Sequence, residues 1–252
     1  DFLHNKIYSR VNIAIAISSV IKNNLIETTT LTEDKIKIIF NGVDLEKFNP
    51  ENANRNKLRK ELNIAENEIL IGMTGRFSRG KGHEEFLFAA NQLSKKFSYL
   101  KFVFVGEASH GEDEYANSVK QLALNYQLKN VYFTGFRSDI PDVLAAMDVF
   151  VFPSHSESFG IALIEAMAMF KPSVCSNSEG VLDIAVDNET SYLFKVKDGN
   201  GLAKNLGQLI LDPEKRKTFG NNARKRVTEF FNLEKVTDQI INVYSKLIED
   251  RG

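Results

Sequence analysis

The feature that most constrains the fold is a regular alternation of short apolar runs with longer amphipathic segments. Short runs of this kind are typical of strands buried on both faces, as in a parallel sheet. They occur at Ile69–Thr74, Lys101–Val105, Val131–Thr134, Val149–Phe152, Ser173–Ser176 and, more weakly, Ser191–Val196.

Segments with helical spacing separate these runs. The predicted helices are roughly Lys81–Phe97, Glu112–Tyr126, Ile140–Met147, Gly160–Met169 and Leu182–Val186, followed by three near Gly201–Leu211, Glu214–Phe231 and Leu233–Glu249. Strand, helix and strand in repetition imply a parallel sheet that helices cover on both faces. The sequence therefore predicts an α/β fold with a Rossmann-like parallel sheet.

Charge and cysteine content exclude some classes of protein. The 252 residues include 32 basic and 33 acidic side chains. This balance argues against a nucleic-acid-binding protein, because no basic excess is present to release counterions from a phosphate backbone. The single cysteine, Cys175, can form neither an internal disulfide nor a cysteine metal cluster, which fits a reducing compartment. No apolar run approaches the roughly 18–20 residues that span a bilayer.

The first forty residues differ from the rest. Asn5–Ile26 carries a broad apolar face at helical spacing, and a strand-like segment, Lys35–Phe40, ends at the turn signal Asn41-Gly42. The chain begins at Asp1 rather than at methionine, so we expect that an upstream portion has been removed.

The segment after the first apolar run has the outline of a diphosphate cradle. Its sequence is Gly75-Arg76-Phe77-Ser78-Arg79-Gly80-Lys81-Gly82, and it opens into a helix. Glycines let backbone amides approach a ligand closely, and the start of a helix favours an anion. The alternative is an exposed basic turn, but the position between a strand and a helix favours the binding site.

The same segment matches most of a P-loop. Gly75 through Lys81 fits the first seven positions of the pattern G-x-x-x-x-G-K-[ST], but Gly82 stands where a hydroxyl should bind Mg²⁺. Asp148 precedes its apolar run instead of following it, so no strand ends in a convincing aspartate for the metal. The two residues that would bind Mg²⁺ in a nucleoside triphosphatase are therefore missing.

Other apolar runs also end in informative residues. Gly106 and Gly135 follow the second and third runs, which leaves room for a ligand. Glu157 comes after the fourth run, before a helix that starts near Gly160, and Glu165 lies within this apolar helix. A carboxylate there needs a partner. Either the two hydroxyls of a ribose or an ion pair with a lysine or arginine would supply it.

Together these motifs resemble the retaining glycosyltransferases of family 4, which have the two-domain GT-B fold. Glu157 and Glu165, separated by seven residues, match the signature of this family. The other matching motifs, in family order, are Asn41-Gly42-Val43-Asp44, Gly75-Arg76 with Lys81-Gly82, Val105-Gly106, Phe133-Thr134-Gly135 and Pro153-Ser154. The resemblance covers roughly Asn41 to Phe194.

The resemblance implies a role for each site residue. Arg76 and Lys81 would hold the diphosphate of a nucleotide-sugar donor and stabilise its charge as the sugar leaves. Glu157 would contact the donor sugar, and Glu165 would hold the ribose. The further donor-binding residues that it implies are Gly75, Gly82, Gly106, Gly135, Phe136, Arg137, Phe159 and Gly160.

The resemblance also implies a reaction. A nucleotide-diphosphate sugar would be the substrate, and the sugar would pass to an acceptor with retention of its anomeric configuration, as in hexosyltransferases of glycan biosynthesis. We expect no cofactor and no metal, because the chain contains no Asp-x-Asp pair.

The same resemblance implies a division of the chain into three parts. Residues 1–31 would be the end of a missing N-terminal domain that holds the acceptor, residues 32–231 the nucleotide-sugar-binding domain, and residues 232–252 a C-terminal tail helix. We expect the fragment alone to bind the donor without transferring its sugar. We also expect a cytoplasmic protein, with peripheral membrane contact only through the missing domain.

One loop departs from the family pattern. After the fifth apolar run, Glu179 replaces a usual glycine, Asp183 stands where glutamate is usual, and Ser191 replaces another glycine. The alternatives to a transferase are a P-loop-like NTPase, a non-catalytic module of the same fold that binds nucleotide sugars, and a sugar-nucleotide epimerase. The spacing of the two glutamates and the pair of Arg76 and Lys81 favour the transferase.

Overall fold

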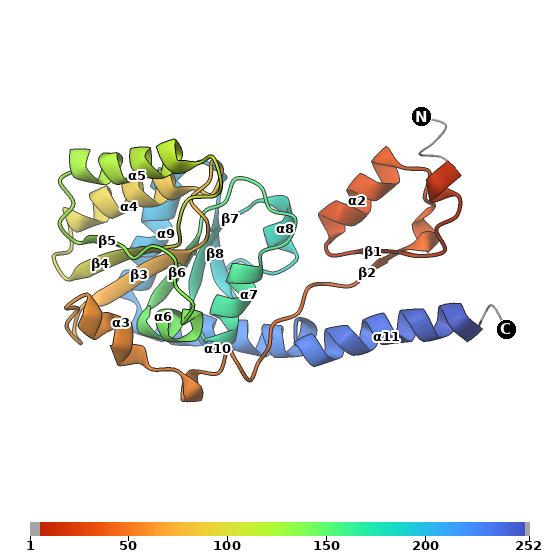
Figure 1. Cartoon of the computed structure of the whole chain (residues 1–252). Coiled ribbons are helices and arrows are strands. Elements are labelled where there is room, and N and C mark those ends of the chain that lie inside the picture. Colours follow the sequence, from red (N-terminus) through yellow and green to blue (C-terminus); the bar gives the residue numbers. More distant parts are fainter. Residues whose placement is uncertain (1–5, 250–252) are drawn as a thin grey trace.

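The computed structural model describes residues 6–249 and contains a six-stranded parallel sheet beside a small N-terminal unit (Figure 1). The strand order is β5-β4-β3-β6-β7-β8. The strands are β3 (Ile69–Thr74), β4 (Leu100–Val105), β5 (Val131–Phe133), β6 (Val149–Phe152), β7 (Ser173–Ser176) and β8 (Ser191–Phe194). Every strand predicted for this sheet is found, and the predicted fold class is confirmed.

Helices cover both faces of this sheet. The first face carries α4 (His83–Ser94), α5 (Asp113–Asn125) and α9 (Gly199–Leu211), and the second carries α3 (Arg55–Glu61), α6 (Ile140–Ala146), α7 (Ile161–Ala168) and α10 (Pro213–Phe230). Each face has its own apolar core. Cys175 is completely buried in the second core, and burial raises the pKa of its thiol to about 12.

The N-terminal unit consists of β1 (Ala14–Ala16), α2 (Ser19–Thr28) and β2 (Ile36–Ile38). The predicted helical face over Asn5–Ile26 is wrong in its middle, where β1 lies, although residues 6–8 and α2 are helical; Asn5 itself is outside the described residues. Ile13, Ile15 and Ile17 alternate with small or polar residues, which is the period of a strand. The Ser18 hydroxyl accepts from the Ile21 amide at 3.2 Å and so caps the start of α2.

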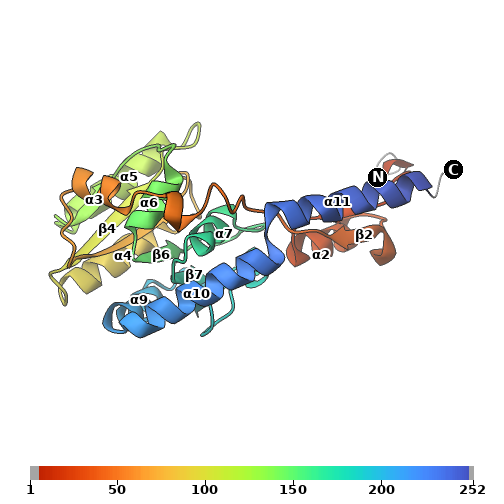
Figure 2. The ribbon, with the colours of Figure 1, turned by 90° about the horizontal axis from the view of Figure 1, so that it is seen from below.

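The last helix returns to this unit. α11 (Leu233–Glu249) lies against the small sheet of β1 and β2 (Figure 2). Val236 and Val243 pack there with Ile13, Ile15 and Ile39. Residues 36–38, which the predicted division assigns to the main domain, pair with β1 instead.

The helix predicted at Leu182–Val186 lies earlier in the chain. α8 spans Glu179–Leu182, and the residues after it form a turn. Arg226 of α10 donates to the carbonyl oxygens of Asp183 at 2.8 Å and Ile184 at 2.7 Å. The arginine thus holds the turn that follows α8.

Short one-turn helices occur at Glu33–Lys35 and Pro50–Asn52. No helix among residues 6–249 is long and apolar enough to cross a lipid bilayer.

Candidate active site

Glycines follow three neighbouring strands at the carboxyl edge of the sheet, where ligands of open parallel sheets bind. Gly75 and Gly106 come directly after β3 and β4, and Gly135 comes shortly after β5. The Gly75 amide donates to the Val105 carbonyl at 2.9 Å, and the Gly106 amide donates to the Gly135 carbonyl at 2.9 Å. A Cβ atom on Gly106 would overlap the carbonyl oxygen of Gly75. The three glycines therefore lie side by side, and Gly75 and Gly106 line a cavity.

The loop between β3 and α4 is locked against the loop between β6 and α7. Gly82 has a φ of +77°, and a Cβ atom there would overlap the carbonyl of Pro153. The His155 amide donates to the Gly80 carbonyl at 2.7 Å, and its ring Nε2 lies 2.9 Å from Oε1 of Glu85. Gly82 thus fixes the spacing of the loops and does not itself line the cavity between them.

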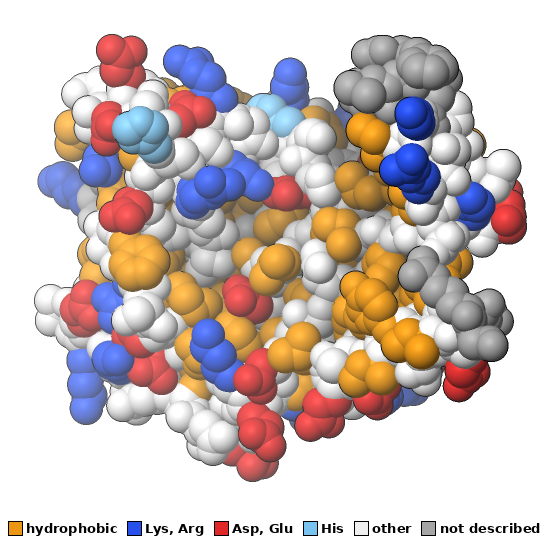
Figure 3. All heavy atoms as spheres, turned by 45° about the vertical axis from the view of Figure 1, so that its right-hand side comes forward, with side chains coloured by type: hydrophobic (Ala, Val, Ile, Leu, Met, Phe, Trp, Pro, Cys, Tyr) orange, Lys and Arg blue, Asp and Glu red, His pale blue; other side chains and the backbone are white. Residues whose placement is uncertain are grey.

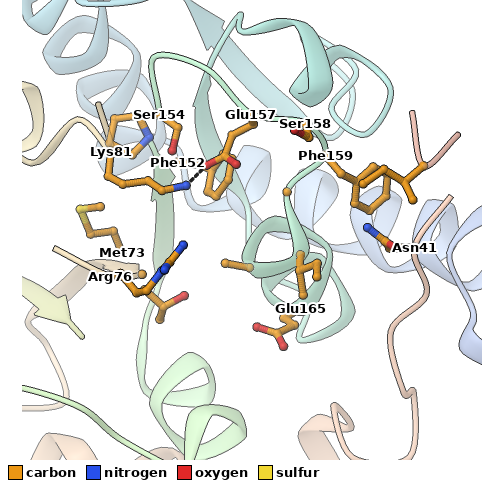
Figure 4. A pocket seen from close by; sticks show the side chains of 17 residues that line it. Asn41, Met73, Arg76, Lys81, Phe152, Ser154, Glu157, Ser158, Phe159 and Glu165 are labelled. Carbon is orange, nitrogen blue, oxygen red and sulfur yellow. Dashed lines mark hydrogen bonds and ion pairs between the residues drawn. The ribbon is translucent and has the colours of Figure 1, made fainter. Parts of the chain in front are cut away.

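A cavity of about 490 Å³ opens between these loops, the start of α7 and the N-terminal unit (Figure 4). This is a usual size for a small-molecule site. Four charged side chains line it: Arg76, Lys81, Glu157 and Glu165. The rest of the lining includes Ile17, Asn41, Thr74, Gly75, Ser154, Phe159, Gly160 and Ala162.

The positive charge in the cavity comes from Arg76 and Lys81, which point into the same space (Figure 4). Lys81 Nζ lies 2.5 Å from Oε1 of Glu157. Arg76 is exposed, and no hydrogen bond or ion pair described within residues 6–249 engages its side chain. His83, at the start of α4, adds no charge at neutral pH, because burial and then the charge of Lys81 lower its pKa to about 4.

Glu165 faces the cavity from an apolar helix. Its neighbours Leu163, Ile164, Ala166 and Met167 are buried. Burial raises the pKa of Glu165 to about 7, and the charge of Lys47 partly opposes this shift. Within the described chain the carboxylate has neither a hydrogen bond nor an ion pair, so it is open to a donor from a ligand.

The start of α7 presents backbone rather than side chains. The Phe159 ring packs against Phe40 at 5.9 Å and Phe231 at 5.7 Å between ring centroids, away from the cavity. Phe159 and Gly160 nevertheless line the cavity just before the first helical residue, Ile161. The first amides of a helix have no intrahelical acceptor and carry partial positive charge, which suits an anion.

A second cavity of about 380 Å³ adjoins the first along the ends of β3, β4 and β5. Phe136 is 70% exposed at its rim. Arg137 pairs with Glu61 at 2.8 Å and with Asp139 at 2.8 Å, and these partners raise the pKa of the guanidinium. The charge of Arg137 is therefore matched by protein groups, and the turn is held in place by them. Glu165 belongs to both cavities.

Some residues of the site are not predicted from the sequence. Thr74 lines both cavities, and its buried hydroxyl has no hydrogen-bond partner in the described part of the chain. Its one signal is its position at the end of β3, before a strand-exit glycine. Ile17 reaches the first cavity from the segment between β1 and α2, which no local motif indicates. Asn41, from the family-matching motif Asn41-Gly42-Val43-Asp44, lines the same cavity.

Asp148 lies at the opposite edge of the sheet from the loop that matches a P-loop. Its Oδ2 accepts from the Leu70 amide at 2.8 Å, near the start of β3, and it pairs with Arg59 at 3.2 Å and Arg55 at 3.0 Å. This aspartate is a structural partner of two arginines.

A family model described as glycosyl transferases, group 1, matches residues 54–226. The chain belongs to the group 1 glycosyl transferases. A curated relative, the capsular polysaccharide biosynthesis glycosyltransferase CapM of Staphylococcus aureus, is 30% identical to this glycosyl transferase. The match covers 94% of this chain and 62% of CapM.

Solved structures agree on the fold. HepE from Anabaena, crystallised with UDP and glucose, matches this glycosyl transferase with a TM-score of 0.88 and 27% identity, over 97% of this chain and 66% of HepE. The C-terminal domain of the group 1 glycosyl transferase LpcC from Francisella tularensis matches with a TM-score of 0.69 and 31% identity, over 76% of this chain and 100% of that domain. The chain has the Rossmann-like C-terminal fold of a GT-B glycosyltransferase.

Proposed function

We propose that this glycosyl transferase chain binds a nucleoside-diphosphate sugar along the two cavities and that the whole enzyme transfers the sugar to an acceptor. The proposal rests on one observation. Two cations, Arg76 and Lys81, and two carboxylates, Glu157 and Glu165, line one cavity at the carboxyl edge of the sheet. The UDP and glucose bound by HepE support this choice of ligand.

The arrangement of the cavities matches the order of groups in such a donor. Glu165 lies where the cavities join, so a ribose held there would place its base toward Phe136 and its diphosphate toward Arg76. A carboxylate can accept from both ribose hydroxyls. The sugar would then lie beyond the diphosphate, near Glu157 and the first amides of α7.

The cations serve the chemical step. Breaking the bond between the sugar and the diphosphate leaves negative charge on the leaving group, and Arg76 and Lys81 are placed to stabilise it. Fixed donors aimed at developing charge contribute about 3–4 kcal/mol each in comparable sites. We propose that transfer needs no metal and retains the anomeric configuration, as the resemblance to family 4 implies.

Transfer also needs an acceptor held against the anomeric carbon. Such positioning contributes about 7–11 kcal/mol to lowering a barrier. The chain spans 62% of the length of CapM, and we propose that the acceptor is held by a part of the enzyme outside this chain. The chain alone would then bind the donor without transferring its sugar. The cytoplasmic location stays a prediction from the cysteine content.

Calorimetric titration with UDP, GDP and ADP in EDTA tests the proposal. We expect one diphosphate to bind in EDTA, with an affinity that added Mg²⁺ leaves within about twofold, because Arg76 and Lys81 neutralise the phosphates. Binding that requires Mg²⁺, or no binding of any of the three, would contradict the proposal.

A further inference from the structure

A carboxylate of the main domain binds the N-terminal unit, in addition to the packing of α11. Asp183, which follows α8, accepts two hydrogen bonds from Ser19, the first residue of α2. One comes from the Ser19 backbone amide at 2.7 Å and the other from its hydroxyl at 2.7 Å. A carboxylate at this position also interacts favourably with the helix dipole. Asp183 thus caps a helix of the neighbouring unit and lines neither cavity.

The backbone around Asp183 is itself fixed. Arg226 holds the carbonyls of Asp183 and Ile184 from α10. The Asp183 carboxylate therefore extends from an anchored segment, and its hydrogen bonds hold the first residue of α2 in place against the main domain.

The other end of α8 touches the candidate active site. The Gly180 amide donates to the Glu157 carbonyl at 3.2 Å, and a Cβ atom on Gly180 would overlap that carbonyl. On the other side of the joint, Ile17 lines the cavity two residues before Ser19. A continuous series of contacts thus joins Ser19, Asp183, α8 and Glu157.

We propose that Asp183 is a positioning residue for the sugar end of the donor. Through Ser19 it places Ile17 at the cavity wall, and through α8 it supports the backbone that carries Glu157. This inference rests on the proposed function, because it assigns the sugar to the space between Ile17 and Glu157. Arg76, Glu165 and Phe136 lie outside this series of contacts, so the nucleotide end should not depend on Asp183.

The test compares the binding of a nucleoside diphosphate with that of its glucose conjugate. UDP, GDP and ADP and their glucose conjugates are titrated into the parent and into Asp183→Ala, Asp183→Glu, Ser19→Ala and Glu189→Gln. Glu189 is an exposed carboxylate on the same segment and serves as the control. Ser19→Ala keeps the backbone hydrogen bond and removes only the one from the hydroxyl.

For Asp183→Ala, we expect the glucose conjugate to lose about fivefold or more in affinity while the diphosphate stays within about twofold, as for a lost charge-assisted hydrogen bond. Asp183→Glu should restore most of the loss, Ser19→Ala should fall between, and Glu189→Gln should match the parent. Equal losses for both ligands in Asp183→Ala, or no loss for either, would overturn the inference.

Hydrogen exchange without ligand separates this inference from the proposed function. In Asp183→Ala, exchange should rise in α2 and also in residues 178–184, beside Glu157. A rise confined to α2 would show that Asp183 only holds the N-terminal unit and would overturn the inference. Failure of the parent to bind any of the nucleotides would instead contradict the proposed function.

Discussion

At the scale of single residues, Arg76 and Lys81 differ in the partners that their side chains have. Lys81 is held by Glu157, whereas Arg76 has no partner within the described residues. Glu157 and Glu165 can be predicted as site candidates from the sequence, because one follows a strand and the other lies in the next helix, and both positions are read from local sequence. Thr74 could not be predicted, since its buried, unpaired hydroxyl results from packing between two cavities.

Replacing either cation should weaken binding of a diphosphate far more than binding of the bare nucleoside. Arg76→Ala and Lys81→Met should each reduce diphosphate affinity roughly tenfold to hundredfold, the usual effect of losing a charge-assisted hydrogen bond. Arg79→Ala is the matched control, because Arg79 lies in the same loop with its guanidinium over the Tyr115 ring at 5.6 Å. Calorimetry with uridine and UDP measures the difference. Equal losses for the two ligands would mean that these side chains only shape the loop.

Glu165 should make stability depend on pH. Its folded-state pKa of about 7 exceeds the ordinary value of 4.5, so folding favours the protonated form. The stability from that form is fully present below the unfolded pKa and is lost as the pH rises through about 7. Glu165→Gln keeps a neutral side chain, so it should raise the free energy of unfolding by about 1–3 kcal/mol at pH 8 and by much less at pH 5.

Denaturant unfolding of the parent and Glu165→Gln at both pH values measures this difference, with Glu189→Gln as the exposed control. The same gain at pH 5 and pH 8 would show that burial does not raise the pKa of Glu165.

At the scale of elements, the strands of the main sheet are predictable because each is a buried apolar run. β1 is not predicted, because the isoleucines of residues 13–17 fit a helical face when counted with their neighbours. α8 lies before its predicted position, and the turn after it is held by Arg226, which is too distant in the sequence to enter a local prediction. α3 is a short helix in a segment without strong periodicity, and no expectation covered it.

The loop of residues 75–82, between β3 and α4, could be predicted only in part. Its glycines and cations are visible in the sequence between a strand and a helix. Its closure against Pro153 and His155 depends on the neighbouring order of β3 and β6, which periodicity alone does not give.

At the scale of the whole molecule, the face between the N-terminal unit and the main domain is hollowed, with charged side chains around the hollow (Figure 3). Ile17 and Asn41 reach the cavity from one side, and Arg76, Glu157 and Glu165 line it from the other. Linkage of the two units through Asp183 and α11 is a property of the fold that no single motif predicts.

Hydrogen exchange of the chain with and without the nucleoside diphosphate that it binds tests the central claim most directly. Protection of the backbone by a ligand marks the segments that the ligand contacts or orders. We predict that protection appears in residues 74–82 and 157–165 together and is absent from residues 6–11, four of which (Lys6, Ile7, Arg10 and Val11) line a separate cavity. Protection confined to residues 6–11, or absent from both site segments while the ligand is bound, would contradict the account.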